Sequence, residues 1–266
     1  VAAVGEMKVA LDTPMSPGSV SFEKKKKKEH ELRCAIAAGV LLNVESPQEM
    51  TLIARLGNSL GIQPRVAIRI NPNFELKSSG MKMGGGPKPF GVDAECVPDL
   101  LKQISGLGLE CIGFHIFSGS QNLNAAAIQD VHEKTVQLAI RLAEYAPSSI
   151  KLINMGGGFG IPYFPGERSL NLPLIGENLQ RLSMILKQHL PAARIALELG
   201  RYIVGEAGIY VCRILERKLS RGQMFLVTDG GLHHHLAASG NFGQVIRKNY
   251  PVIIGNKVYG AEREVV

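Results

Sequence analysis

The sequence predicts an α/β protein with a (β/α)8 barrel of the TIM type, followed by the beginning of a β-rich domain. Three observations lead to this prediction. Short apolar runs alternate with amphipathic helical patterns, each apolar run ends in polar or glycine residues, and the alternation stops after Arg201. Such alternation is typical of a parallel sheet with crossover helices, in which the residues at the strand ends form the functional site.

Six strands are expected in chain order, at residues 20–22, 40–46, 65–72, 111–120, 151–158 and 194–201. Helices are expected between them. Ser46 and Pro47 resemble an N-terminal cap with proline in the first turn, and residues 130–145 and 173–190 form amphipathic patterns. Helices on one side of every strand favour a closed barrel over an open doubly wound sheet.

The chain is expected to change architecture near residue 205. Two extended runs, 209–219 and 223–231, follow each other with no helix between them, and a short polar link containing Gly222 joins them. This pattern predicts an antiparallel pair. We therefore expect a barrel domain over residues 1–204 and the start of a C-terminal β domain over residues 205–266.

Composition indicates a soluble, cytoplasmic protein with no membrane partner, because 45% of the residues are hydrophobic but no apolar run approaches the ~20 residues that span a bilayer. The formal net charge is +7, and most of it comes from the run Lys24 to Lys28. We interpret this run as a solvated loop, so no nucleic-acid partner is expected.

No metal site is expected either. The four cysteines, Cys34, Cys96, Cys111 and Cys212, lack CxxC spacing and are interpreted as reduced core side chains. Three consecutive histidines, 233–235, have no carboxylate or cysteine at ligand spacing, and neighbouring residues rarely face one ion together.

The run Gly156, Gly157 and Gly158 ends a predicted strand and points to an anion, most plausibly a phosphate. Glycines remove the Cβ atoms that keep a phosphate away from backbone N–H groups, and they permit positive φ angles. Ser120 and Arg201 could add donors. A tight strand-to-helix turn would show the same glycine run, and that alternative stays open.

Glu198 lies three residues before Arg201, and a carboxylate would repel a phosphate. We therefore expect it to face a cationic part of the same ligand. Pyridoxal phosphate (PLP) satisfies both demands, because it carries a phosphate and a pyridine nitrogen that becomes cationic beside a carboxylate. The alternative is a plain salt bridge between Glu198 and Arg201.

Several motifs together resemble the fold-type III PLP-dependent decarboxylases, which include diaminopimelate and ornithine decarboxylases. They are RVAIRINP, the stretch from Lys82 to Gly91, GFHIFSGSQN, INMGGGFG, ELGRY and VTDGG, and they extend in the same order over about residues 1–260. The resemblance is greatest to the subgroup of butirosin biosynthesis and exosortase-associated pathways. It implies an alanine racemase-like barrel that binds PLP, a homodimer with shared active sites, and an amino-acid substrate that is diaminopimelate-like or bound to a carrier protein.

The resemblance also implies roles for individual residues. Ser120 and the three glycines would hold the phosphate with help from Arg201, and Glu198 would pair with the ring nitrogen, followed by Leu199 and Gly200 at the cofactor. The alanine racemases place an arginine at that nitrogen, so a glutamate indicates decarboxylation. Phe117 stands where diaminopimelate and ornithine decarboxylases have a histidine stacked on the ring.

Two further residues are expected to point into the barrel. His115 shares a strand face with Phe117 and either lies below the cofactor or is a hydrogen-bonded core histidine. Arg69 either reaches the cofactor region or forms a buried ion pair.

The sequence departs from the family in two places. The Schiff-base lysine of the family lies in a Y-A-x-K-A-N strand that has no counterpart here, and the C-terminal G-P-x-C-x-x-x-D element is also missing. We therefore expect a chain truncated at both ends, with six of the eight barrel strands. Two alternatives remain: a catalytically silent, decarboxylase-like regulator, and a phosphate-binding barrel enzyme of other chemistry.

Overall fold

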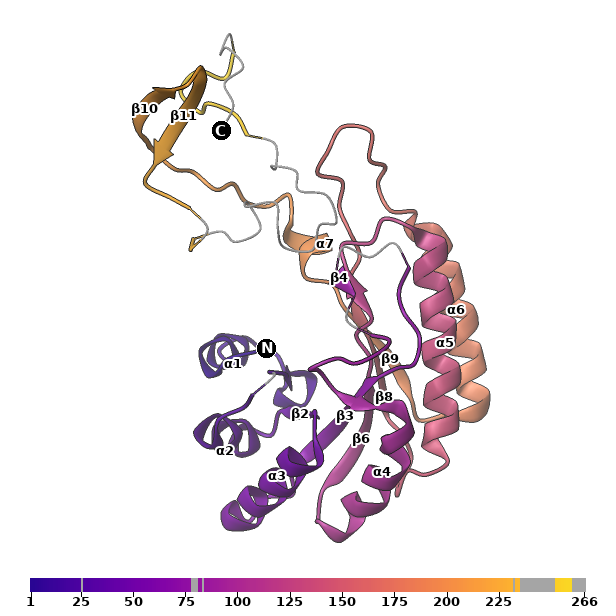
Figure 1. Ribbon diagram of the computed structural model, residues 1–266. Helices are drawn as coiled ribbons and strands as arrows, with labels where there is room; N and C mark the ends of the chain where they lie inside the picture. Colours follow the sequence, from indigo (N-terminus) through magenta and orange to yellow (C-terminus); the bar gives the residue numbers. More distant parts are fainter. Residues whose placement is uncertain (25, 78–80, 83, 232, 235–251, 260–266) are drawn as a thin grey trace.

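A parallel sheet forms the centre of the protein in the computed structural model, which describes residues 1–24, 26–77, 81–82, 84–231, 233–234 and 252–259 (Figure 1). Its main strands lie side by side in chain order and run parallel: β1 (Ser21–Phe22), β2 (Leu41–Val44), β3 (Arg65–Asn71), β6 (Glu110–His115), β8 (Leu152–Gly157) and β9 (Arg194–Glu198). All six strands predicted from the apolar runs are confirmed.

Three short strands flank this sheet. β5 (Val92–Asp93) pairs with the end of β3, and β4 (Met81–Lys82) pairs antiparallel with β7 (Gly119–Ser120). The predicted strand at 111–120 is therefore two strands, because β6 ends at His115 and the chain leaves the sheet before Gly119.

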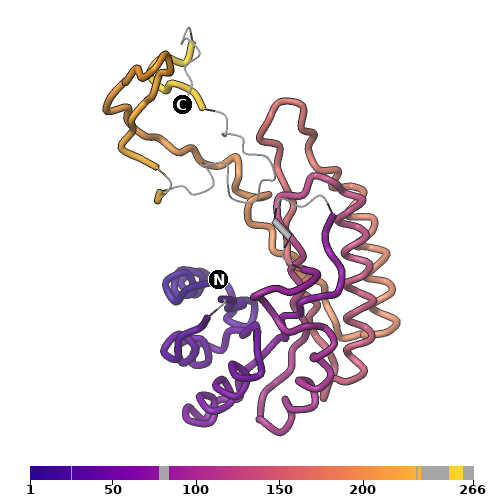
Figure 2. The backbone as a smooth tube through the Cα atoms, in the orientation of Figure 1, coloured from indigo at the N-terminus to yellow at the C-terminus, as the bar shows by residue number. Residues whose placement is uncertain are grey.

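Helices connect the strands, as predicted (Figures 1 and 2). They are α1 (Val4–Leu11), α2 (Glu29–Ala38), α3 (Pro47–Leu60), α4 (Val97–Gly106), α5 (Ala125–Ala143), α6 (Leu172–His189) and α7 (Arg201–Val204), with 3-10 turns at Pro17–Ser19 and Ala94–Cys96. The predicted cap of α3 is confirmed, since the Ser46 hydroxyl accepts a hydrogen bond of 3.1 Å from the Glu49 amide.

The helix predicted at 130–145 begins earlier, at Ala125. Asn124 caps it through a hydrogen bond from the Ala127 amide, and three alanines form its first turn. Alanine has the highest helix propensity but adds little to the apolar period, so the periodicity alone placed the start too late.

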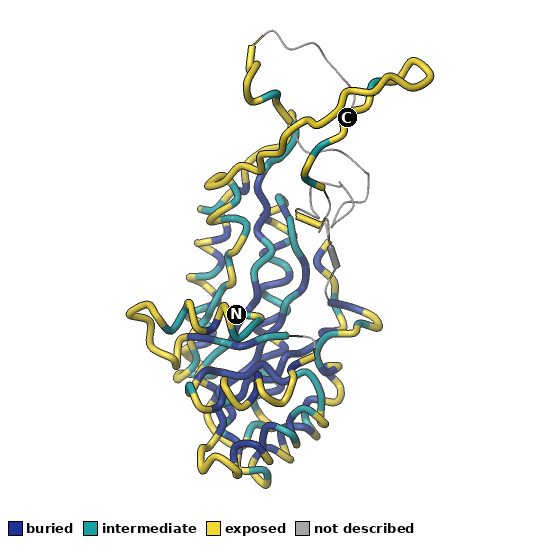
Figure 3. The backbone as a smooth tube through the Cα atoms, turned by 90° about the vertical axis from the view of Figure 1, so that its left-hand side faces the viewer, coloured by how far each residue is buried: buried dark blue, intermediate teal, exposed yellow. Residues whose placement is uncertain are grey.

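The two faces of the sheet differ in chemistry. Between the sheet and its helices, strand residues such as Phe22, Leu42, Ile68 and Phe114 are completely buried. On the other face a small apolar cluster of Leu41, Ala67 and Ile112 is followed along the strands by buried polar residues: Asn43, Arg69, His115 and Asn154. The register pairs Arg69 with His115 and His115 with Asn154, so this polar layer crosses neighbouring strands (Figure 3 shows the buried interior).

After α7 the chain forms an antiparallel hairpin of β10 (Ile214–Ser220) and β11 (Gln223–Thr228), which confirms the predicted pair. The hairpin stands apart from the sheet (Figure 1). Residues 232, 235–251 and 260–266 lie outside the described residues, so the domain division at 204/205 stays a prediction.

Two composition-based interpretations are wrong in part. Lys27 is buried, because its ammonium group donates to the Asn43 carbonyl (2.7 Å) and to Glu49 Oε1 (2.8 Å); only Lys25 of the run lies outside the described residues. Of the cysteines only Cys111 is buried, while Cys34, Cys96 and Cys212 are exposed on helices and loops. Among the described residues, no helix has the length and apolar character needed to cross a membrane.

Candidate cofactor-binding site

A cavity of about 200 Å³ opens where β6, β8 and β9 end. Its lining includes seven of the predicted site residues: Phe117, Ser120, Gly158, Glu198, Leu199, Gly200 and Arg201. Gln121 and Phe159 complete the lining and were not predicted. The cavity thus combines one carboxylate, one guanidinium and one hydroxyl around a small space.

Glu198 ends β9, and both of its carboxylate oxygens have partners. The Asn154 side-chain amide donates to Oε1 (2.8 Å), and His115 Nε2 lies 3.3 Å from Oε2. Burial by itself raises the pKa of Glu198, but the hydrogen bond and charge of His115, together with the Asn154 amide, outweigh it and lower the pKa to about 2. The group is therefore a carboxylate at neutral pH, and the alternative salt bridge to Arg201 is wrong because His115 takes that place.

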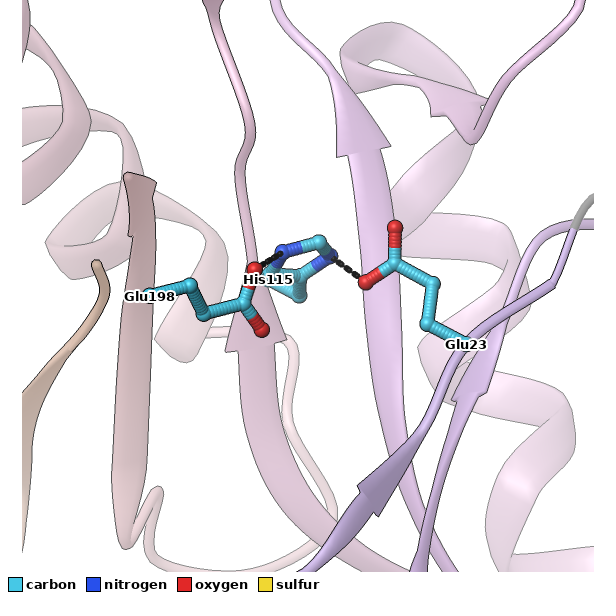
Figure 4. A group of neighbouring side chains, drawn as sticks. All are labelled: Glu23, His115 and Glu198. Atoms are coloured by element: carbon cyan, nitrogen blue, oxygen red, sulfur yellow. Dashed lines mark hydrogen bonds and ion pairs between the residues drawn. The ribbon is translucent and has the colours of Figure 1, made fainter. Parts of the chain in front are cut away.

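His115 is completely buried and lies between two carboxylates (Figure 4). Its Nδ1 is 3.1 Å from Glu23 Oε2, on the side of the ring opposite Glu198. The three residues have donor atoms close enough for a metal ion, but the carboxylates face different ring nitrogens. One ion binds a single nitrogen of an imidazole, so this arrangement is a row of charged contacts and does not form a chelating set. Nε2 has a hydrogen bond to Glu198, and Nδ1 has an ion-pair contact with Glu23 without hydrogen-bond geometry.

Arg69 does not line the cavity. Its guanidinium forms ion pairs with Glu23 (2.5 Å) and Glu45 (2.8 Å) and lies over the ring of Phe90, 5.0 Å from the centroid. The alternative of a buried ion pair is thus what the structure contains, and contact between Arg69 and a cofactor stays a prediction.

Close packing of the surrounding chain requires glycine at positions 156, 157 and 158, whether or not a phosphate binds there. A Cβ on Gly156 would lie 2.7 Å from the Phe117 ring, one on Gly157 would lie 1.7 Å from the Glu198 carbonyl oxygen, and one on Gly158 would lie 2.0 Å from the Gly119 carbonyl oxygen. Gly156 and Gly158 also have positive φ angles, of 68° and 89°. The Gly156 amide donates to the Asn154 side chain (2.9 Å), so of the three glycines Gly158 remains as the one that lines the cavity.

Gln121 fixes the position of Arg201. The guanidinium donates to Gln121 Oε1 (3.1 Å), and the Gln121 amide donates to the Ile161 carbonyl (2.6 Å). Gln121 has φ 52°, a left-handed conformation that is uncommon for a side chain of this kind and is found at functional sites. Arg201, Ser120 and Gly158 line the same cavity, and this set of donors suits a phosphate.

A larger groove, of about 820 Å³, adjoins this cavity. It is lined by the loops before α5 and α6, including Asn124, Glu167, Arg168 and Asn171, and Gln121 lines both spaces. The smaller cavity holds the ionised Glu198 and the arginine, so it is the better candidate for the cofactor ring and phosphate, and the groove is open space beside it.

Four residues of the site escaped the sequence reasoning. Gln121 directly follows Ser120, and Asn154 lies two residues before Gly156 on the same strand face, so strand alternation could have identified Asn154. Glu23 directly precedes the lysine run, and the net charge of that run gives no information on where the Glu23 side chain lies. Phe159 offered no signal beyond its place after the glycines.

Comparison with known proteins agrees with this geometry. Residues 1–205 match the sequence model of the family described as pyridoxal-dependent decarboxylase, pyridoxal binding domain. The chain is 36% identical over 258 residues to the L-glutamyl-[BtrI acyl-carrier protein] decarboxylase of Niallia circulans, covering 95% of this chain and 59% of that protein. It is 32% identical over 232 residues to the diaminopimelate decarboxylase of Aquifex aeolicus, covering 86% and 54%.

Among solved structures, diaminopimelate decarboxylase from Helicobacter pylori in complex with L-lysine aligns with a TM-score of 0.76 and 27% identity, covering 90% of this chain and 59% of that one. The parallel sheet therefore matches part of the TIM barrel that binds PLP in that enzyme. The chain spans between half and two thirds of the length of these relatives. It belongs to the family of pyridoxal-dependent decarboxylases, within the domain that binds the pyridoxal cofactor.

Proposed function

We propose that the protein containing this chain is a PLP-dependent decarboxylase of an L-amino acid. The observation that carries this proposal is an ionised glutamate in the wall of a cavity whose other residues suit a phosphate. Bound PLP supplies an electron sink that stabilises the carbanion left when an amino acid loses CO₂. A carboxylate at the ring nitrogen favours the cationic ring on which that electron sink depends.

The chain's own residues have separable tasks in this proposal. Glu198 keeps a negative charge at the ring nitrogen, and Phe117 covers one face of the ring. Ser120, Gly158 and Arg201 hold the phosphate, with Gln121 setting the direction of the guanidinium. Gly157 permits β9 to approach β8 closely enough to bring Glu198 into the cavity.

The experiment that tests the proposal uses the full-length protein. Purified protein should be yellow from bound PLP, lose that colour on treatment with borohydride, and release CO₂ from an amino acid. Colourless full-length protein that does not take up added PLP would contradict it. A protein that binds PLP and releases no CO₂ from any substrate would instead favour the catalytically silent, decarboxylase-like regulator.

Two substrate classes are candidates, and the relatives represent both. One is free diaminopimelate, and the other is an amino acid bound to an acyl-carrier protein. The groove beside the cavity favours the second, because about 820 Å³ exceeds what the side chain of a free amino acid needs. Comparing CO₂ release from meso-diaminopimelate, L-glutamate and L-glutamyl carrier protein separates them, and we also expect the active form to be a homodimer.

A further inference from the structure

Behind Glu198 a row of charged side chains crosses the inner face of the sheet. His115 lies 3.3 Å from Glu198, Glu23 lies 3.1 Å from His115, and Arg69 lies 2.5 Å from Glu23. Arg69 in turn contacts Glu45 at 2.8 Å. These residues come from the ends of β9 and β6, from β3, and from the segments after β1 and β2, so the sheet register brings them together.

Each nitrogen of the His115 ring interacts favourably with the carboxylate that it faces only when that nitrogen carries hydrogen. Each ring nitrogen faces a carboxylate oxygen, and a carboxylate accepts hydrogen bonds without donating any (Figure 4). A neutral imidazole would present a lone pair to one of its two neighbours. Glu23 therefore attracts the Nδ1 side of the ring across an ion-pair distance of 3.1 Å without hydrogen-bond geometry, while Nε2 donates to Glu198.

Most of these contacts are shielded from water. The side chain of His115 is completely buried, those of Arg69 and Glu45 are 6% and 8% exposed, and that of Glu23 is 21% exposed. Glu198, by contrast, is 41% exposed on its side chain, because it faces the cavity. The row is thus a rigid support with one end open to a ligand.

We propose that Glu23 and His115 are a positioning pair for Glu198: Glu23 holds the Nδ1 side of the imidazole in place through their ion-pair contact, and the imidazole directs the Glu198 carboxylate at the ring nitrogen of the bound cofactor. The inference rests on the proposed function, since it assigns Glu198 to that nitrogen. It adds two residues, from distant parts of the chain, that act without touching the cofactor.

The test compares two probes, PLP and the analogue in which CH replaces the ring nitrogen, by measuring their dissociation constants with the full-length protein. The wild type should prefer PLP. Glu23→Gln and His115→Asn should each lower this preference by about tenfold, equal to about 1.4 kcal/mol. The double variant should lower it no further than His115→Asn alone, because Glu23 acts through the imidazole.

A control outside this row is Glu110→Gln, which removes a carboxylate paired with Lys151 (2.8 Å) at the other end of β6 and should leave the preference unchanged. A merely structural role of Glu23 or His115 would weaken binding of both probes equally, and that result would overturn the inference while leaving the proposed function intact. Additive losses in the double variant would also overturn it. A wild type that binds neither probe would instead contradict the proposed function.

A second measurement needs no variant and covers the case in which a substitution prevents folding. The ¹⁵N chemical shifts of the His115 ring in the wild type should report hydrogen on Nε2, the nitrogen that faces Glu198. A ring with hydrogen on Nδ1 alone would overturn the inference.

Discussion

At the scale of single residues, the charge of Glu198 makes a prediction about acid stability. Its pKa in the folded protein is about 2, below the ordinary value of 4.5, because the hydrogen bond and charge of His115 outweigh the effect of burial. A lowered pKa means that the carboxylate stabilises the fold above about pH 4.5, and that this contribution is lost as the pH falls towards 2. Urea unfolding between these pH values should show a steeper loss of stability in the wild type than in Glu198→Gln.

The same substitution separates stability from function. Glu198→Gln keeps the shape of the side chain and removes its charge, so we expect decarboxylation by the full-length protein to fall by roughly 100-fold or more. Parallel acid-unfolding profiles for wild type and variant would contradict the first expectation, and unchanged CO₂ release would contradict the second.

Lys27 is the residue for which the structure most changes the interpretation of the sequence. Its ammonium group is the partner of Glu49 in a pair with no exposed surface on the lysine side. Lys27→Met should destabilise the fold by about 3–5 kcal/mol, because it removes the cationic partner of Glu49, whose side chain is only 13% exposed. Lys26 is exposed in the same run, so Lys26→Met should change the free energy of unfolding by less than about 0.5 kcal/mol. Equal effects in urea unfolding would show that the run is one solvated loop after all.

At the scale of elements, the pairing of β8 with β9 depends on Gly157. A Cβ at this position would lie 1.7 Å from the carbonyl oxygen of Glu198, and the two residues are partners in the strand register. Gly157→Ala should therefore push β9 away, cost about 3 kcal/mol or more, and weaken PLP binding by moving Glu198. Gly176→Ala, in the second turn of α6 with open space around it, should instead stabilise the protein by about 0.5–1 kcal/mol. Thermal unfolding of both variants and PLP titration check this contrast.

The packing of α5 makes a second pH-dependent prediction. His132 is buried on α5, 3% exposed, and burial lowers its pKa from 6.5 to about 4. Below pH 6.5 the unfolded chain therefore binds a proton that the folded protein excludes, and stability falls as the pH drops towards 4. The loss over this range is on the order of 3 kcal/mol, and His132→Leu should abolish it. Wild-type and variant stabilities that run parallel from pH 7 to pH 4 would contradict this account.

The elements themselves were largely predictable, because each depends on a local pattern. β3 and β8 are apolar runs that end in polar or glycine residues, and the Ser46–Pro47 cap is a short-range signal that the structure confirms. The boundaries were less predictable. β6 ends at His115, where the chain leaves the sheet. The apolar run continues past this point, so the sequence pattern does not predict where the strand ends.

At the scale of the whole molecule, the residues that line the candidate cavity could be predicted from the sequence, whereas the residues behind Glu198 could not. Glu198, Ser120 and Arg201 stand in motifs, so a family resemblance identifies them. The contact of His115 with Glu23 and Glu198 joins residues from three separate strand ends, and it exists only because the register of the sheet aligns them. The strand register cannot be derived from a single sequence. The partners of Glu23 and Lys27 could not be predicted either, because Glu23 adjoins the lysine run and Lys27 lies within it.

The hairpin β10–β11 leads to a prediction about assembly. Its apolar side chains Leu215, Leu219, Phe225 and Val227 are exposed, and an isolated two-stranded hairpin is marginally stable in water, so another surface should cover it. We predict that the full-length protein is a dimer and that this hairpin contributes to the contact.

Sedimentation at increasing concentration should show dimers for the wild type and a weaker association for Phe225→Asp combined with Leu219→Asp. Met184, an exposed apolar residue on α6, provides the control, because Met184→Asp should leave association unchanged. A hairpin variant that dimerises as tightly as the wild type would place the contact elsewhere.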